Sequence, residues 1–383
     1  MRWKNWLIKG LLWALNPEAT RPRTKNTETK FLVVSTTGLG DTLWATPAIR
    51  ALRQTYPDCT IAVLTSEIGY QVLEHNKHID EIFVIGSPLF LSLLRYLPRL
   101  KRERFDTILV FHASQRLILP FCALLEAPHL MGTLGLNKDL DFLLTKGFAL
   151  KAQHEIERRL EMVREVGAYV GDYSLEMMVH KENVDAATAF LQGHGIADHI
   201  PIVGLHPGAK NTFKQWPADC FVEVGKRLVQ HLGCQILVTG DQSEAIELLE
   251  IASQIPGAIP IAGELNLTTF TALLKRMQLF ITNDTGPMHL AFAAKVPTVC
   301  LFGPTDPNRC GPYHVPNATV LSVPKTCQPC LKKKCNQPFC LLQIGVDAVY
   351  DAALRSCLKT LSSLEASSFP TELPLEPWSA LKV

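Results

Sequence analysis

Short apolar runs alternate with helical stretches along most of the chain, and this alternation occurs twice. In the first half, the strand-like runs are residues 30–35, 60–64, 81–85 and 107–112. In the second half, they are residues 202–205, 235–239, 258–261, 279–282 and 298–302. Strands that alternate with helices are typical of α/β domains built on a parallel sheet. The pattern therefore predicts two doubly wound, Rossmann-like domains that face a cleft.

The same pattern divides the chain into five parts. A basic, tryptophan-rich segment with a polar linker is expected over residues 1–29, and a first domain over 30–175. A linker over 176–199 leads to a second domain over 200–345, and a C-terminal helix, expected at 346–361, begins a final part over 346–383. Ligands of such domains bind at the carboxyl ends of the strands, so we expect them at the domain interface.

Composition supports a globular chain with a real core. Of the 383 residues, 47% are hydrophobic and 19% are charged, which excludes a disordered chain. The net charge of +2 argues against a nucleic-acid partner. The eleven cysteines lie mostly in apolar runs, which favours buried thiols in a reducing compartment over a disulfide scaffold. No apolar stretch is long enough to span a bilayer.

The N-terminal segment combines basic residues with Trp3, Trp6 and Trp13. It lacks a small-residue cleavage site, so a removable signal peptide is not expected. Tryptophan with lysine is typical of interfacial membrane anchors, which favours membrane contact over a helix docked on the protein's own surface. A second basic cluster fits a solvated helix end better than a ligand site, although an anionic ligand would suit it; its members are Arg95, Arg99, Lys101, Arg102 and Arg104.

The segment 281–291 carries the most informative pattern. An apolar run ends in the polar loop 283–286, and Pro287 is expected at the first position of a helix that runs to Ala294. The free N–H groups and the dipole of a helix N-terminus favour an anion. Asp284 cannot attract a phosphate and is expected to bind hydroxyls. A helix N-terminus that binds an anion, next to a carboxylate that binds hydroxyls, suits a nucleotide-sugar. An Asx-capped helix without a ligand explains the same residues about equally well.

In each half, a glycine-containing loop follows the first strand. Gly38-Leu-Gly-Asp41 allows the backbone to approach a ligand, but it is not a dinucleotide fingerprint because a third glycine is absent, and Asp41 as a plain helix cap is the alternative. The loop 206–217 brings together Lys210, Thr212 and Lys214, and a lysine can stabilise a pyrophosphate without a metal. A solvated basic loop is the alternative, above all for Lys210.

Other polar residues also follow predicted strands. Asp241 and Glu244 could accept hydrogen bonds from a ribose or an adenine, or could simply cap a helix. Arg116 could bind a phosphate or carboxylate bidentately, or could lie on the surface of the next helix. Thr305 is expected near the same edge as the loop 283–286.

Four cysteines lie close together near the end of the second half. Four thiols at this spacing could form a tetrahedral zinc site, and free thiols or a disulfide are the alternatives. The spacing is less specific than that of paired C-x-x-C knuckles. The four residues are Cys327, Cys330, Cys335 and Cys340.

Several of these motifs resemble those of glycosyltransferase family 9, the ADP-heptose:lipopolysaccharide heptosyltransferases. The segments 281–291 and 299–307 resemble the family's donor-site signature, and Lys-x-Trp-Pro at 214–217 and Gly40-Asp41 match further motifs. The resemblance implies a GT-B architecture in which Asp41 is the general base, Lys214 stabilises the leaving phosphate and Asp284 holds the donor sugar. Many relatives carry a basic residue before the first glycine, where this chain has 35–37, Ser-Thr-Thr.

The resemblance also divides the remaining candidates between two substrates. Acceptor contacts are expected from Gly38, Gly40 and Arg116. Donor contacts are expected from a larger set: Asp284, Thr285, Gly286, Met288, His289, Lys210, Thr212, Asp241, Glu244 and Thr305. For His289, packing remains the stronger interpretation.

The function implied by the resemblance is inverting transfer of heptose from ADP-heptose to the lipopolysaccharide inner core, with no cofactor required. The partners would be the nucleotide-sugar, the lipopolysaccharide core with its lipid A, and the membrane surface. The protein would be cytoplasmic and peripheral on the inner face of the inner membrane. The alternatives are another nucleotide-sugar-using transferase or an epimerase or hydrolase on the same fold, and an inactive membrane-associated binding protein. The tryptophan-rich N-terminus counts against the epimerase or hydrolase, and the presence of both Asp41 and Lys214 counts against the inactive binding protein.

Overall fold

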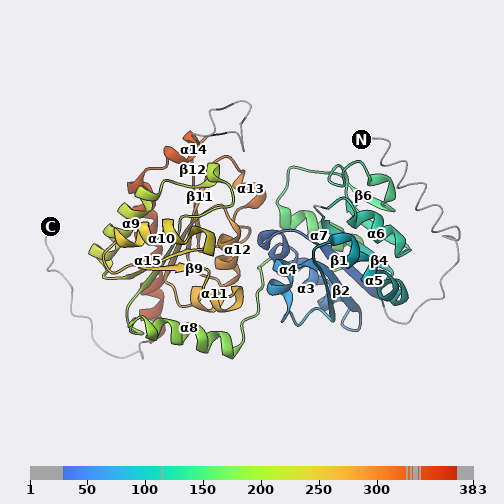
Figure 1. The fold of residues 1–383 in the computed structure, drawn as a ribbon, viewed down its shortest axis with the longest axis horizontal. Helices are drawn as coiled ribbons and strands as arrows, with labels where there is room; N and C mark the ends of the chain where they lie inside the picture. The colour runs from blue at the N-terminus through green and yellow to red at the C-terminus, as the bar shows by residue number, and fades with distance from the viewer. Residues whose placement is uncertain are drawn as a thin grey trace.

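The computed structural model of the protein describes residues 29–113, 115–324, 327, 330, 335 and 338–368, without the side chains of 358–368. Two parallel six-stranded sheets lie side by side in it, each flanked by helices (Figure 1). The predicted fold class, two doubly wound Rossmann-like domains, is therefore confirmed. The bounds proposed for the five parts of the chain stay a prediction, and nearly all of the segment 1–29 lies outside the described residues.

The first half of the chain forms one sheet with its helices. Its strands are β1 (Lys30–Ser35), β2 (Thr60–Ser66), β3 (Glu81–Ile85), β4 (Thr107–His112), β5 (His129–Thr133) and β6 (Lys146–Phe148). Its helices are α2 (Leu39–Leu43), α3 (Thr46–Thr55), α4 (Glu67–Leu73), α5 (Leu89–Glu103), α6 (Ile118–Leu124) and α7 (Glu155–Glu165), with a 3₁₀ turn, η1 (Asp141–Leu143).

The second half repeats this plan. Its strands are β7 (Ile202–His206), β8 (Gln235–Gly240), β9 (Ile259–Ala262), β10 (Leu279–Asn283), β11 (Thr298–Phe302) and β12 (Ala318–Ser322). Its helices are α8 (Lys181–Gly193), α9 (Ala218–Leu232), α10 (Ala245–Ser253), α11 (Leu267–Leu274), α12 (Gly286–Ala293), α13 (Pro307–Cys310), α14 (Phe339–Leu342) and α15 (Val346–Ser368). Two 3₁₀ turns are η2 (Thr212–Lys214) and η3 (Gln242–Glu244).

Both sheets have the same strand order. It is β3-β2-β1-β4-β5-β6 in the first and, from the other edge, β9-β8-β7-β10-β11-β12 in the second. In each sheet the first strand pairs with the fourth, β1 with β4 and β7 with β10. The connections that leave such a central pair run in opposite directions, which opens a crevice at the carboxyl ends where doubly wound sheets bind ligands.

The structure adds to the predicted elements and corrects one helix start. The additional strands β5, β6 and β12 are short, and β6 and β12 lie at sheet edges. Helix α8 lies in the stretch expected to be a linker. Helix α12 begins at Gly286, so the expectation that Pro287 occupies the first helical position was wrong. The second position suits proline equally well, because its N–H group would also lack an intrahelical acceptor. Among the described residues, no helix is long and apolar enough to cross a membrane.

Helix α2 of the first half packs directly on α12 of the second. A Cβ atom added to Gly40 would lie 2.8 Å from Cδ2 of His289, and one added to Gly286 would lie 2.8 Å from Cδ2 of Leu39. One continuous apolar core also includes residues of both halves, Leu43 and Met288 among them. The glycines therefore set how closely the two halves approach each other.

We expect Gly40→Ala to destabilise the protein by about 1–3 kcal/mol, because the new methyl group overpacks the contact with His289. Thermal unfolding would measure the effect. Gly38→Ala is the matched control, because a Cβ there meets no atom within 4 Å and the backbone has a φ of −85°. The control should stay within about 0.5 kcal/mol of the wild type. Equal effects of the two substitutions would contradict the importance of this contact.

Candidate active site

Asp41 lies in the first turn of α2, directly after the loop that leaves β1. Its side chain is 25% exposed, and Oδ1 accepts a hydrogen bond from Nη2 of Arg159 at 3.2 Å. Among the described residues, no other side chain is bonded to this carboxylate. A carboxylate that is held at one oxygen and partly open to solvent has the geometry that a general base needs.

The end of β4 and the loop after it contact the loop that leads from β1 to α2, the helix that carries Asp41. The hydroxyl of Thr36 donates to Oε1 of Gln115 at 3.0 Å, and Nδ1 of His112 lies 3.0 Å from Oγ1 of Thr37. Burial lowers the pKa of His112, while the nearby Asp41 raises it. Arg116 directly follows Gln115 in the chain and is half-buried; its role in acceptor binding stays a prediction.

Lys214 and Asp284 form a close ion pair in the second half. Nζ of Lys214 lies 2.6 Å from Oδ2 of Asp284, whose side chain is only 6% exposed. The hydroxyl of Thr305 donates to the same oxygen. In the described part of the chain, no hydrogen bond reaches Oδ1 of Asp284. The structure thus brings together three residues that the sequence placed after three different strands.

The buried side chain of Asn283 joins the two loops that carry this pair. Its Oδ1 accepts from the backbone N–H of Trp216 at 3.0 Å, and its Nδ2 donates to the carbonyl of Pro207 at 2.7 Å. Because both partners belong to the loop 206–217, Asn283 fixes Lys214 relative to Asp284. No role of its own was predicted for Asn283, although its position beside Asp284 was a usable signal.

The residues at the start of α12 differ in exposure. Thr285 is the N-cap and Gly286 the first helical residue, so the helix begins directly after Asp284. The side chains of Met288 and His289 are buried. The His289 ring contacts the Trp44 ring edge-on at 4.8 Å between centroids, and its Nδ1 has no hydrogen-bond partner. Any donor contact from Met288 must therefore come from its backbone, while His289 lies between the Asp41 and Asp284 sides of the site.

Asp241 and Glu244 form a capping box at η3. Asp241 accepts hydrogen bonds from the N–H and hydroxyl of Ser243, which lowers its pKa, and Glu244 accepts from the N–H of Asp241 at 2.9 Å. Burial raises the pKa of Glu244. Its carboxylate also lies against Gly208, where an added Cβ would be 2.1 Å from Oε1. Glu244 is thus packed beneath the loop 206–217, while Asp241 remains exposed.

The other basic-loop candidates lie at its surface. Lys210 and Thr212 are exposed, whereas Lys214 is partly buried at the end of η2. Lys214 is therefore the lysine of this loop that the fold holds in place beside Asp284.

An unpredicted cluster of charges lies behind Asp41 at the start of α7. Glu155 pairs with both Arg158 and Arg159, at 2.6 and 3.0 Å. Arg309 of the second half reaches the other oxygen of Glu155 at 3.7 Å, and Nε2 of His154 lies 3.1 Å from the carbonyl of Gly311. The sequence pattern predicted a helix here but no link to the site.

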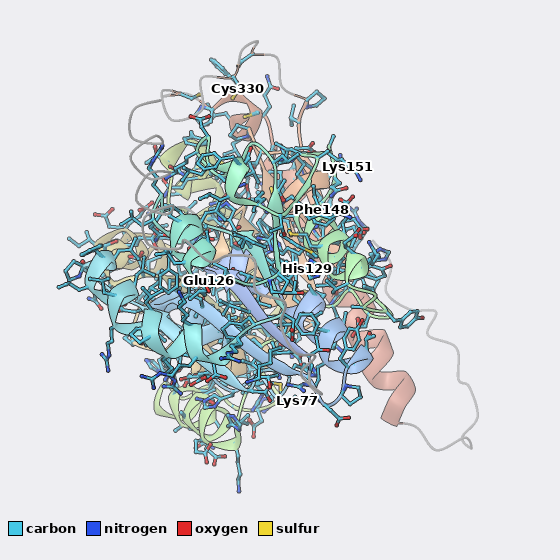
Figure 2. All side chains as sticks on the ribbon, turned by 90° about the vertical axis from the view of Figure 1, so that its right-hand side faces the viewer. Lys77, Glu126, His129, Phe148, Lys151 and Cys330 are labelled. Atoms are coloured by element: carbon cyan, nitrogen blue, oxygen red, sulfur yellow. The ribbon has the colours of Figure 1, made fainter. Side chains whose placement is uncertain are left out.

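Of the four clustered cysteines, Cys330 lies at the top of the view in Figure 2, and a Cβ added to Gly303 would lie 3.4 Å from Sγ of Cys340. The thiols of Cys327, Cys330 and Cys335 all raise the pKa of Cys340, after the larger effect of burial. Yet no group of three or more His, Cys, Asp or Glu side chains in the described residues is arranged to hold a metal ion. The geometry therefore gives no support to the predicted zinc site, which stays a prediction.

The first half contributes the partly exposed carboxylate of Asp41. The second half contributes the ammonium group of Lys214, the carboxylate of Asp284, which can accept hydrogen bonds from hydroxyls, and the N-terminus of α12. The α2–α12 contact holds the two sets next to each other. Such a site can activate a hydroxyl on one side and stabilise a diphosphate leaving group on the other. With the two doubly wound halves, this defines a glycosyltransferase of the GT-B class.

Comparison with known proteins gives the family. Residues 94–340 match glycosyltransferase family 9 (heptosyltransferase), and the chain belongs to this family. It is 26% identical over 319 residues to lipooligosaccharide heptosyltransferase 2 of Campylobacter jejuni, covering 80% of this chain and 91% of that protein. It is 27% identical over 282 residues to lipopolysaccharide heptosyltransferase 3 of Escherichia coli K12, covering 70% and 80%.

Solved structures are similar as well. A family 9 glycosyl transferase from Veillonella parvula has a TM-score of 0.78 and 25% identity, covering 88% of this chain and all of that one. The ADP-heptose lipopolysaccharide heptosyltransferase II of E. coli has a TM-score of 0.71 at 20% identity, with 86% and 99% covered. The resemblance inferred from the sequence motifs is therefore confirmed, as is the prediction of a glycosyltransferase.

Stability should fall as the pH is lowered, because three histidines are held neutral by burial. The pKa values of His154, His206 and His289 are lowered to about 4. In the unfolded chain they return to about 6.5, so the unfolded state binds more protons between these values and is favoured as the pH falls. From pH 7 to pH 5 we expect each histidine to cost about 1–2 kcal/mol of unfolding free energy.

Urea unfolding at the two pH values would measure this loss. His206→Gln removes one of the three titrating groups, and His206 belongs to the second half, whereas Asp41 belongs to the first. Between the two pH values, this variant should lose less unfolding free energy than the wild type, by the contribution of one histidine. A pH dependence identical to that of the wild type would contradict the assignment.

Proposed function

We propose that the protein transfers heptose, with inversion at the anomeric carbon, from ADP-heptose to the lipopolysaccharide inner core. The single observation that carries this proposal is the position of Asp41 in α2, packed on the very helix whose N-terminus follows Asp284. The heptose and the lipopolysaccharide come from the names of the relatives and from the family. The contacts in the site support a nucleotide diphosphate donor and a hydroxyl acceptor.

The proposed reaction assigns each charged group one task. Asp41 takes the proton of an acceptor hydroxyl as its oxygen bonds to the anomeric carbon. The bond from that carbon to the β-phosphate oxygen breaks, and the electron pair leaves with ADP. Lys214 and the N-terminus of α12 stabilise the charge that develops on the diphosphate. Oδ1 of Asp284 accepts hydrogen bonds from the donor sugar, while Lys214 and Thr305 hold Oδ2.

We further propose that the protein acts at the inner face of the inner membrane and that α5 lies on the lipid. The side chains of Phe90, Leu91 and Leu94 are 59%, 60% and 47% exposed. Exposed Arg95 and Arg102 follow on the same helix, and an apolar patch beside basic residues suits an anionic lipid surface. The patch also follows β3 at the carboxyl edge of the first sheet, the edge on which Asp41 lies.

The start of the described chain adds to this argument. Lys30 is tied to the basic end of α5, with its N–H 2.8 Å from Asp106 and its Nζ 3.0 Å from Glu103. The described chain therefore starts beside the basic end of α5, and the tryptophan-rich segment 1–28 precedes it in the sequence. Both candidate membrane contacts belong to the first half, where the lipid-borne acceptor is expected.

Release of ADP on mixing the protein with ADP-heptose and delipidated core oligosaccharide tests the reaction. We expect ADP only when acceptor is present, together with a product heavier by one heptose. Asp41→Asn should lower kcat by about 10²-fold or more while donor affinity is largely kept. Release without acceptor would indicate a hydrolase, and release only with another nucleotide-sugar would overturn the donor. Full activity of Asp41→Asn would show that the base is a different group.

Sedimentation with vesicles tests the membrane proposal. The protein should bind vesicles that contain phosphatidylglycerol and bind neutral phosphatidylcholine vesicles much more weakly. Replacing Phe90, Leu91 and Leu94 by serine should weaken binding by about tenfold or more. Serine at Ile246 and Leu249, two apolar positions on α10 that are at least as exposed, is the matched control and should have no effect. If only deletion of residues 1–28 abolishes binding, α5 is not the lipid contact.

A further inference from the structure

Arg159 is a fully buried arginine whose contacts all converge on the active site. Its side chain is 0% exposed, although it lies only four residues into α7 from Glu155. Burial is the main cause that lowers its pKa, and Asp41 and Glu155 raise it. Burying a guanidinium is costly, and a partner must compensate for the lost hydration. A residue of this kind in the wall of an active site therefore calls for an explanation.

The guanidinium is divided between two carboxylates. Nη2 lies 3.2 Å from Oδ1 of Asp41, and Nη1 lies 3.0 Å from Oε2 of Glu155 and 2.7 Å from the Glu155 carbonyl. The Trp44 ring covers it, with Cζ 5.4 Å from the ring centroid. Nε is buried without a hydrogen-bond partner. The side chain thus has little freedom to turn, so the position of Oδ1 of Asp41 is fixed as well.

We propose that Arg159 is the positioning residue of the catalytic base. By holding Oδ1 it directs Oδ2 of Asp41 towards the acceptor hydroxyl. When Oδ2 takes the hydroxyl proton, Arg159 keeps Glu155 as its counter-ion, so the proton transfer does not leave a buried cation unpaired. This inference rests on the proposed function, because it assumes that Asp41 is the base.

Arg158 provides a matched control. It is buried to 3% exposure in the same helix and pairs with the same Glu155. Its other partners are the carbonyl of Phe111 and the hydroxyl of Thr133, at 3.0 and 2.9 Å, and not Asp41. Loss of either arginine removes a buried cation from Glu155, but only loss of Arg159 releases the base.

The experiment compares steady-state transfer by Arg159→Met, Arg159→Lys and Arg158→Met. Arg159→Met should lower kcat by about 10–100-fold with the donor KM changed less than about threefold, because misplacing a reacting group by about 1 Å can cost about 10²-fold. Arg159→Lys restores a cation and should recover part of this loss. Arg158→Met should lower the thermal midpoint by a similar amount but keep kcat within about threefold of the wild type.

A double-mutant cycle separates positioning from general damage. In the Asp41→Asn background, Arg159→Met should reduce kcat by less than about threefold further, because its effect passes through the lost carboxylate. Two losses that multiply would overturn the proposal, as would an equal fall in kcat for Arg158→Met. Full activity of Asp41→Asn would instead overturn the base assignment itself. Loss of activity in Asp41→Asn with full activity in Arg159→Met would refute only the role of Arg159.

Discussion

The direct contact between α2 and α12 is the constraint on which the active site depends. Gly40 lies against the His289 ring, and Gly286 lies against the Leu39 side chain, so at each of these two contacts one helix offers only backbone to a side chain of the other. The proposed base and the proposed leaving-group site are therefore held together at a separation that these two glycines set. A methyl group added at either glycine would move the proposed base, Asp41, away from Asp284 and the start of α12.

Much of this site could be predicted because the residues follow central strands. In a doubly wound sheet, chain order alone places the ends of β1 and β4 together, and likewise those of β7 and β10. Asp41, Arg116, Lys214 and Asp284 all occur shortly after such ends. The long apolar runs of the central strands are clear signals. The strands β6 and β12 at the sheet edges are short and only partly buried, so their pattern was too weak to detect.

Other features depend on contacts that no local pattern encodes. Arg159 and Asp41 are 118 positions apart, and their pairing requires α7 to return to the end of β1. Periodicity predicted α7, but it gave no reason for a charged residue on the buried face. The amide of Asn283 bridges residues 67 and 76 positions away for the same reason. Packing was the stronger expectation for His289, and the structure shows the ring buried, but its neighbours across the interface, Gly40 among them, could not be read from the sequence.

The confinement of the donor-side contacts to one half has a consequence for evolution and for engineering. Lys214 and Thr305 both bond to Asp284, and Asn283 bonds to the backbone of the loop 206–217, without help from the first sheet. If these residues bind the donor as proposed, donor binding is confined to the second half, and the first half could be exchanged to accept a different acceptor. Such a chimera must keep one feature. Whichever acceptor it binds, the helix that replaces α2 must have a glycine at the position where Gly40 contacts His289.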